Sequence, residues 1–203
     1  NTTASHNTAI GRNTLTANTS GTRNVAVGNY ALESNTTAND NIAIGYEALE
    51  DNTTGTLNVA VGSYALDANT TADKNTAIGY DTLSANTTGT QNTALGTYGL
   101  KACQTGNDNT GIGYIALYNA NGSQNTAVGS RALQDMTTGD DNTAIGYHAL
   151  HTNTTASDNT AVGSNALFAN TTGLQNTAIG VNALDANTTA NNNTAVGYNA
   201  LTA

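Results

Sequence analysis

The chain has 203 residues and a formal charge of −9, from 14 acidic and 5 basic side chains. Only 9% of residues are charged and there is no proline, so the composition differs from that of a disordered chain. The scattered acids and the lack of a basic patch argue against nucleic-acid binding, and the sequence has no long apolar run that could span a membrane.

One motif recurs along the chain, N-T-A-[IV]-G-Y-x-A-L-x-x-N-T-T-[AG]-x-x, whose residues are numbered here as positions 1 to 17. Successive copies follow at a 17-residue spacing, as from Asn7 to Asn24, and one step is shorter by a single residue. Asn at position 1, Gly at position 5 and Leu at position 9 are present in all twelve copies. A unit this short cannot bury a face alone, which predicts an all-β, parallel β-solenoid in which like residues stack. The copies begin at Asn7, Asn24, Asn41, Asn58, Asn75, Asn92, Asn109, Asn125, Asn142, Asn159, Asn176 and Asn193.

Within each copy, taken in chain order, positions 1 to 4 predict a short strand, as at 7–10. We expect the aliphatic side chain at position 4 in the core, with the residue at position 2 on the same inward face. Gly11 then ends the strand and permits a sharp corner. Residues 13–16 predict a second extended segment that buries Leu15, and residues 18–21 predict a return turn in which Asn18 tolerates left-handed backbone. These interruptions exclude an amphipathic helix.

A second period of two copies overlies the first, because position 4 is Ile in odd copies and Val or Leu in even ones. Two geometries fit: 17-residue coils, which we favour, or 34-residue coils with odd and even copies on opposite sides. The short step lies between Leu117 and Asn125 and predicts a deletion within the turn.

The domain organisation predicted is a single solenoid over residues 1–203. Because neither end shows a capping segment, we expect either an excerpt of a longer fibre or copies that stack head to tail. Each coil has a thin core, and the Asn-Ala-Gly strand face is small enough for another sheet to approach closely. We therefore expect self-association, as a homotrimer or as a head-to-tail filament.

The stretches N-T-A-I-G-Y-D-T-L at 75–83 and N-T-A-I-G-Y-H-A-L at 142–150 resemble repeats of bacteriophage tail fibres and bacterial surface fibres. They are also similar to the N-[ST]-x-A-[IV]-G repeats in the heads of trimeric autotransporter adhesins. The resemblance covers nearly the whole chain and implies a left-handed, trimeric β-roll in an extracellular fibre that attaches to surfaces. Repeat length departs from the adhesin heads, whose coils are shorter, so handedness and packing need not transfer.

No catalytic, cofactor-binding or metal-binding residue is predicted. His148 and His151 are interpreted as surface variants and Cys103 as a tolerated substitution. Asn-Thr-Thr triplets match the acceptor pattern for N-glycosylation. The preference of asparagine and threonine for turns accounts for the same triplets without any sugar. They occur at Asn35, Asn52, Asn69, Asn86, Asn153 and Asn170. A tyrosine row could cover the core edge or stack on sugars, and it comprises Tyr46, Tyr80, Tyr114, Tyr147 and Tyr198.

The function predicted is that of a structural or adhesive segment of an extracellular fibre. Its partners would be copies of itself and possibly cell-surface glycans. An enzyme is not expected, because no insertion forms a cleft with clustered acids. The alternative is an ice-binding solenoid, although Val25, Ile42 and Val59 in the threonine row argue that this row points inward. That row comprises Thr8, Thr76, Thr93, Thr110, Thr126, Thr143, Thr160, Thr177 and Thr194.

Overall fold

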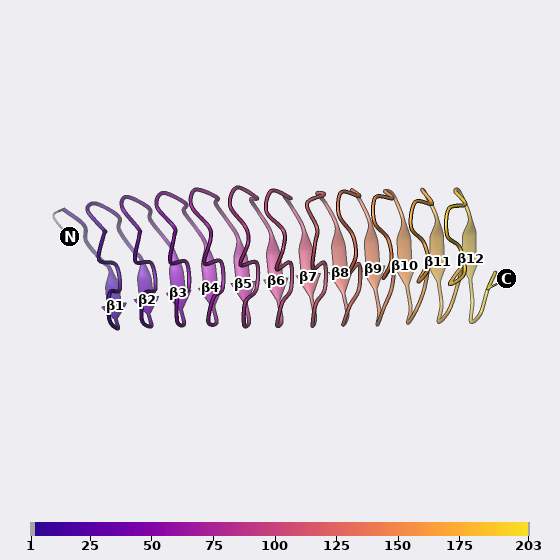
Figure 1. Cartoon of the computed structure of the whole chain (residues 1–203), viewed down its shortest axis with the longest axis horizontal. Coiled ribbons are helices and arrows are strands. Elements are labelled where there is room, and N and C mark those ends of the chain that lie inside the picture. The colour runs from indigo at the N-terminus through magenta and orange to yellow at the C-terminus, as the bar shows by residue number, and fades with distance from the viewer. Residues whose placement is uncertain (1–2, 203) are drawn as a thin grey trace. The chain divides into compact units, whose positions relative to one another are not determined.

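The computed structural model describes residues 3–202, which form twelve three-residue strands and no helix (Figure 1). Their contacts group the chain into two compact units, Asn1–Thr105 and Gly106–Ala203, each of which is described by itself. The first unit contains β1 (Thr8–Ile10), β2 (Val25–Val27), β3 (Ile42–Ile44), β4 (Val59–Val61), β5 (Thr76–Ile78) and β6 (Thr93–Leu95). The second contains β7 (Thr110–Ile112), β8 (Thr126–Val128), β9 (Thr143–Ile145), β10 (Thr160–Val162), β11 (Thr177–Ile179) and β12 (Thr194–Val196).

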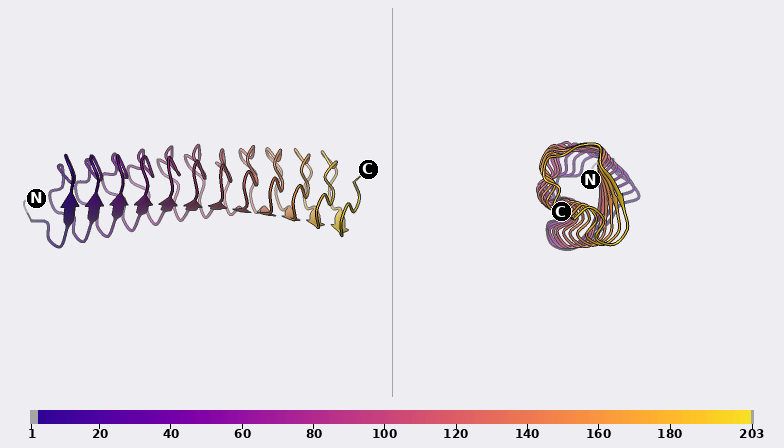
Figure 2. Two further views of the ribbon diagram at one scale, coloured as in Figure 1. Left: turned by 90° about the horizontal axis from the view of Figure 1, so that it is seen from below. Right: turned by 90° about the vertical axis from the view of Figure 1, so that its right-hand side faces the viewer.

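Each coil of the solenoid corresponds to one copy of the 17-residue repeat, as predicted. In both units the strands pair in parallel with the strand of the next repeat, so that Thr8 lies opposite Val25 and Thr160 opposite Thr177. The strand forms one side of each coil, and turns and bends form the rest (Figure 2). The alternative of two copies per coil is excluded, because Ile44 would then lie beside Ile78 instead of Val61.

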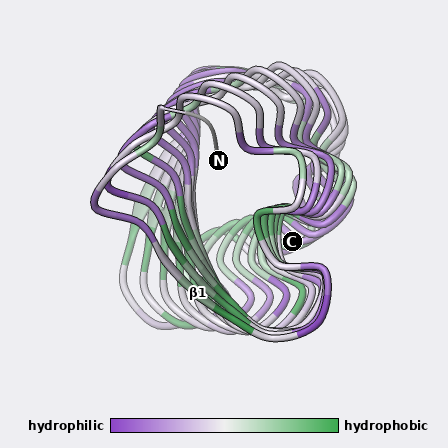
Figure 3. Cartoon of the chain, turned by 90° about the vertical axis from the view of Figure 1, so that its left-hand side faces the viewer, coloured by the Kyte–Doolittle hydropathy of each residue, from purple (hydrophilic) through white to green (hydrophobic). Residues whose placement is uncertain are grey.

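The two faces of each strand point in the directions opposite to those we expected. Ala43 and Ala60, at position 3, are fully buried, whereas Ile42 and Ile44, which flank Ala43, are 38% and 40% exposed. Positions 2 and 4 therefore point out of the solenoid and form the hydrophobic strand wall visible in Figure 3. The prediction that the small Asn-Ala-Gly face packs against another chain is wrong, because that face lines the interior.

The narrowness of the coil explains this orientation. So short a loop encloses room for one leucine and several alanines, but not for an additional layer of β-branched side chains. Leu66, Ala65 and Ala60 fill the interior of one coil and have no solvent exposure. Alanine at position 3 is replaced only by glycine, at Gly111, as expected where any extra methyl group would overpack the core.

Two columns of buried asparagines hold successive coils together. At position 1, the backbone N–H of Asn24 donates to Oδ1 of Asn7 at 2.9 Å, and Nδ2 of Asn24 donates to the Ala38 carbonyl at 2.8 Å. At position 12, Nδ2 of Asn69 donates to Oδ1 of Asn52 at 2.9 Å. Each amide thus serves both the neighbouring coil and its own turn, which satisfies polar groups that the single short strand leaves unpaired.

The predicted second extended segment is absent from the described residues, and turns occupy positions 6 to 11 instead. The leucine at position 9 has left-handed backbone, with φ of 53° at Leu66, and so do the residues at positions 7 and 17, such as Tyr64 and Lys74. Such backbone is rare for a bulky side chain and persists only where packing determines it. Asn18 has no positive φ; its Nδ2 donates to the Gly21 carbonyl of its own turn, and its Oδ1 accepts from Nδ2 of Asn35 in the next coil.

Glycine at position 5 makes the predicted corner. Gly79 has a φ of 140°, and a Cβ atom there would lie 2.7 Å from the carbonyl oxygen of Gly96 in the next coil. Both the backbone angle and the close approach of neighbouring coils therefore require glycine.

The short repeat lacks one turn residue, as predicted. The Asn109 side chain donates to the Gly122 carbonyl at 2.8 Å, in the same way that full-length coils bond, and β7 pairs with β8 without a shift of face. Within residues 3–202, no helix is long and apolar enough to cross a membrane.

Candidate interaction surfaces

The outer strand face, defined as the side chains at positions 2 and 4, presents exposed aliphatic side chains at position 4 in each unit. In the first unit Ile44, Ile78 and Leu95 are 40%, 38% and 43% exposed, although each has neighbours above or below it in the sheet. In the second unit Ile145 and Ile179 are 41% exposed. Contiguous exposed apolar surface is a general feature of sites that contact other molecules.

The position 2 column of this face differs between the units. It is threonine in every strand from β7 to β12, whereas Val25, Ile42 and Val59 interrupt it in the first unit. The threonines are partly or fully exposed and repeat in register with the strand spacing. The second unit thus presents a regular outward array of hydroxyl and methyl groups, contrary to our expectation of an inward row.

The tyrosine ladder of the first unit, Tyr30, Tyr46, Tyr64, Tyr80 and Tyr98, is a continuous run of ring contacts. Neighbouring rings are edge to face, with centroids 5.5 to 5.9 Å apart. Tyr46 and Tyr80 belong to the predicted row at position 6. The other three are at position 7 and were missed, although their strict alternation with position 6 was a signal available in the sequence.

Carboxylates surround the middle of this ladder. A hydrogen bond with Glu47, together with burial, raises the pKa of Tyr46 to about 12. Burial and the charges of Asp81 and Asp51 raise the pKa of Asp67 to about 6, although backbone hydrogen bonds oppose the shift. Burial and neighbouring acids, Glu47 first among them, also raise the pKa of Glu50. This part of the surface therefore concentrates negative charge beside aromatic rings.

Basic side chains of the chain itself occupy both ends of the ladder. The Lys101 Nζ atom lies 4.8 Å from the centroid of the Tyr98 ring and 2.5 Å from Oδ2 of Asp81. At the other end, the Arg12 guanidinium lies 5.9 Å from the Tyr30 centroid. Both contacts are within the range of cation–π attraction.

His148 and His151 lie in a half-buried aromatic cluster of the second unit, and not on the open surface as predicted. The His148 ring stacks on Tyr147 at 3.8 Å between centroids, and His151 stacks on Phe168 at 5.3 Å. Burial lowers the pKa of both histidines, so the imidazoles are neutral near pH 7. Across residues 3–202, no group of three His, Cys, Asp or Glu side chains is arranged to hold a metal ion.

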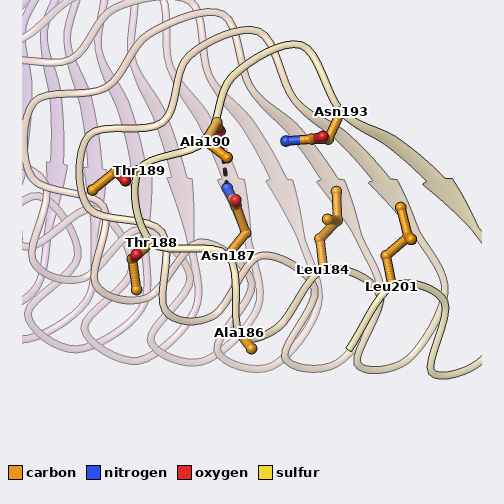
Figure 4. Close-up of a pocket in the computed structure, with 8 residues that line it drawn as sticks. All are labelled: Leu184, Ala186, Asn187, Thr188, Thr189, Ala190, Asn193 and Leu201. Carbon is orange, nitrogen blue, oxygen red and sulfur yellow. Dashed lines mark hydrogen bonds between the residues drawn. The ribbon is translucent and has the colours of Figure 1, made fainter. Parts of the chain in front are cut away.

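A hollow lies at the open end of the last complete coil (Figure 4). Its volume is about 350 Å³, and Leu184, Asn187 and Asn193 are among the residues that line it. The Asn187 amide donates to the Ala190 carbonyl at 3.1 Å, as in the preceding coils. These positions are covered by the next coil elsewhere in the unit, so the hollow is a cross-section of the core and offers no distinct chemistry.

The Asn-Thr-Thr triplets cannot accept glycans in the folded chain. Asn35, Asn52, Asn69, Asn86, Asn153 and Asn170 are all fully buried. Cys103 is likewise fully buried and forms no disulfide. It occupies position 12, where it replaces a ladder asparagine.

No protein-family model, curated protein or solved structure matches the chain. The fold therefore defines its class: it is an all-β repeat protein built as a parallel β-solenoid with one 17-residue repeat in each coil. The left-handed winding and the trimer remain predictions.

Proposed function

We propose that this solenoid is a structural segment of an extracellular fibre, in which chains associate through their outer strand faces. The observation that carries the proposal is the row of exposed aliphatic side chains at position 4 of that face in both units. Covering one isoleucine or valine completely contributes about 1.5–3 kcal/mol, so partial burial repeated along several coils is sufficient for a stable contact.

We propose a trimer as the stoichiometry. The outer strand face occupies one side of each coil, and a threefold arrangement would cover all three copies of that face with one kind of contact. The resemblance of the repeat to trimeric adhesin heads supports the same stoichiometry, the extracellular location and an adhesive role. Enzymatic activity forms no part of this proposal.

Sedimentation equilibrium of the full chain tests the association. We expect a stable oligomer, and we expect Ile44→Lys together with Ile78→Lys to produce folded monomers, because burying an unpaired ammonium group is costly. Thr88→Lys, in an exposed turn of the same unit, is the matched control and should leave the oligomer intact. A native chain that sediments as a monomer at all concentrations would contradict the proposal.

The outward threonine column supports a second candidate, an ice-binding solenoid. In the second unit every strand presents threonine beside isoleucine or valine, and the strands repeat at about 4.8 Å. Such an array could order water in register with a crystal surface. Thermal hysteresis and ice-crystal shaping would test it: Thr160→Lys should abolish both effects, whereas Thr155→Lys, in an exposed turn, should not. Native protein that neither lowers the freezing point nor shapes crystals would eliminate this candidate.

A further inference from the structure

Coils are numbered here in chain order from the copy that begins at Asn7, so coil 6 comprises residues 92–108 and coil 4 comprises residues 58–74. Coil 6 contains a complete site for an ammonium group, which the chain's own lysine occupies. Tyr98 is at position 7, Asp81 is at position 7 of the preceding coil, and Lys101 is at position 10. The Lys101 Nζ atom lies over the ring of Tyr98 and forms an ion pair with Asp81. An aromatic face and a carboxylate together are a recognised means of holding a cation.

Coil 4, two coils earlier, has residues of the same kind at two of these three positions. Tyr64 corresponds to Tyr98 and Glu47 corresponds to Asp81, but Asp67 takes the place of the lysine. The Tyr64 ring is fixed on both sides, by edge-to-face contacts with Tyr46 at 5.5 Å and Tyr80 at 5.9 Å. Coil 4 therefore presents an aromatic ring with two carboxylates.

In the described residues, no lysine or arginine forms an ion pair with Glu47 or Asp67 or a cation–π contact with Tyr64. Glu47 instead accepts a hydrogen bond from the Tyr46 hydroxyl. The Oδ1 atom of Asp67 is shielded from solvent and has no hydrogen-bond partner there. Burial, with a contribution from Glu47 and other acidic groups, also raises the pKa of Tyr64. A cation placed over this ring would reduce the repulsion among these acidic groups.

We propose that Tyr64, Glu47 and Asp67 bind the ammonium group of a lysine side chain from a partner polypeptide. Lys101 shows which chemistry fits, because a primary ammonium group on an alkyl stem already occupies the equivalent place two coils further on. The site requires only neighbouring coils of one chain, so it is independent of the proposed self-association.

Binding of a tetralysine peptide to the full chain, followed by calorimetry at low salt, tests the site. We expect binding that is absent for the fully acetylated peptide, which has lost its charges. Tyr64→Asn and Asp67→Lys should each weaken binding about tenfold or more, the size expected for losing a charged contact. Both replacements are native at these positions in other coils, at Asn165 and Lys101, so the fold should be retained.

A charge-matched control separates the site from general attraction to an acidic protein. Asp158→Lys changes the charge equally at an exposed position where coil 4 has Lys74, and it should leave binding unchanged apart from a small salt-dependent effect. Conversely, Lys101→Asp should create a second site, with Tyr98 and Asp81, and raise the stoichiometry from one peptide to two.

Three results would overturn the proposal. The first is absence of binding, and the second is binding that Asp158→Lys weakens as much as Asp67→Lys. The third is spermidine binding as tightly as tetralysine, since that would assign the site to small polyamines and not to a polypeptide.

Discussion

At the scale of single residues, buried asparagine is the unusual choice in this core. A carboxamide is costly to bury unless its donors and its acceptor are all used. Here Asn24 meets that condition because its amide bonds to its own turn while its Oδ1 accepts from the Asn41 backbone. Side-chain hydrogen bonds therefore connect successive coils where the backbone forms no sheet.

The interruption of the position 12 ladder at Cys103 gives a first prediction. The buried Oδ1 of Asn86 has no hydrogen-bond partner among residues 3–202, because the next coil has a thiol in place of an amide donor. Cys103→Asn alone would move the unpaired oxygen to residue 103, because Ala120 follows it in the column. Replacing Cys103, Ala120 and Met136 together by asparagine should complete the column from Asn86 to Asn153 and stabilise the chain by about 1 kcal/mol, measured by urea unfolding. Cys103→Ala, which mimics the residue at Ala120, should give no such gain. Equal stability of the two variants would contradict this explanation.

Asp67 gives a second prediction, on pH. Its folded-state pKa of about 6 lies above the ordinary value of 3.8, so the folded chain holds the proton more tightly than the unfolded chain. The contribution of Asp67 protonation to the free energy of unfolding is therefore fully present below about pH 4 and is lost as the pH rises through about 6. Because the group is partly exposed, the change should be on the order of 1 kcal/mol.

Thermal unfolding of the native chain and of Asp67→Asn at several pH values measures this effect. The native melting temperature should fall between pH 4 and pH 6, and the variant should show a shallower dependence in that window. Glu50, whose pKa is also raised, should keep a residual slope of the same sign. An unchanged slope in the variant would show that Asp67 does not cause it.

At the scale of the elements, the orientation of each strand decides what the molecule presents to its surroundings. Ala77 is fully buried, whereas the flanking Ile78 is 38% exposed. Ala77→Val should therefore overpack the interior and destabilise the chain by about 1–3 kcal/mol. Thr76→Val introduces the same residue one position earlier on the outside, where Val59 is native in the neighbouring strand, and should change stability by less than about 0.5 kcal/mol. Urea unfolding of the two variants checks this contrast, and a larger effect of Thr76→Val would contradict the assigned orientation.

Much of the fold could be predicted from the sequence, because the 17-residue register fixes the coil, the strand and the glycine corner. The strand orientation could not, since the usual rule places β-branched residues inside. That rule fails where the coil is too narrow for them. The better signal was size: position 3 admits only Ala or Gly, whereas position 2 varies among Thr, Val and Ile.

The turns and the tyrosine ladder were also only partly predictable from the sequence. Left-handed backbone at Leu66 was not predictable, because leucine rarely adopts it and only stacking between coils enforces it. Two of the five ladder tyrosines, Tyr46 and Tyr80, were predicted as part of a row at position 6. The completion of the ladder by the tyrosines at position 7 depends on how a turn brings positions 6 and 7 of adjacent coils together, which spacing alone does not determine.

At the scale of the whole molecule, the backbone and the surface follow two different periods. The backbone repeats with every coil, because each coil pairs only with its neighbours. The surface of the first unit repeats with every second coil, because its tyrosines alternate between positions 6 and 7. Stability in such an array is approximately a sum over coils and the contacts between adjacent coils.

Coil deletions should separate these periods. Removing residues 58–74 or residues 41–74 should leave cooperative unfolding and an unchanged far-ultraviolet spectrum, whereas removing residues 58–66 should destroy the fold. Only the removal of residues 58–74 places Tyr46 beside Tyr80 at identical positions, so it should change the near-ultraviolet dichroism per remaining tyrosine more than the removal of residues 41–74 does. Loss of folding on removing whole coils would contradict the additive description.

The left-handed residues have a consequence for how the chain folds. Leu66, Tyr64 and Lys74 place three unfavourable backbone conformations in a single coil, and the contacts that stabilise them come from the coils on either side. An isolated coil therefore has the full free-energy cost of these backbone conformations and few contacts that offset it. A coil added to an existing stack forms hydrogen bonds and packing contacts with its neighbour, and these offset the cost. Folding should begin rarely and then advance quickly from one coil to the next, so a short preformed stack would act as a seed.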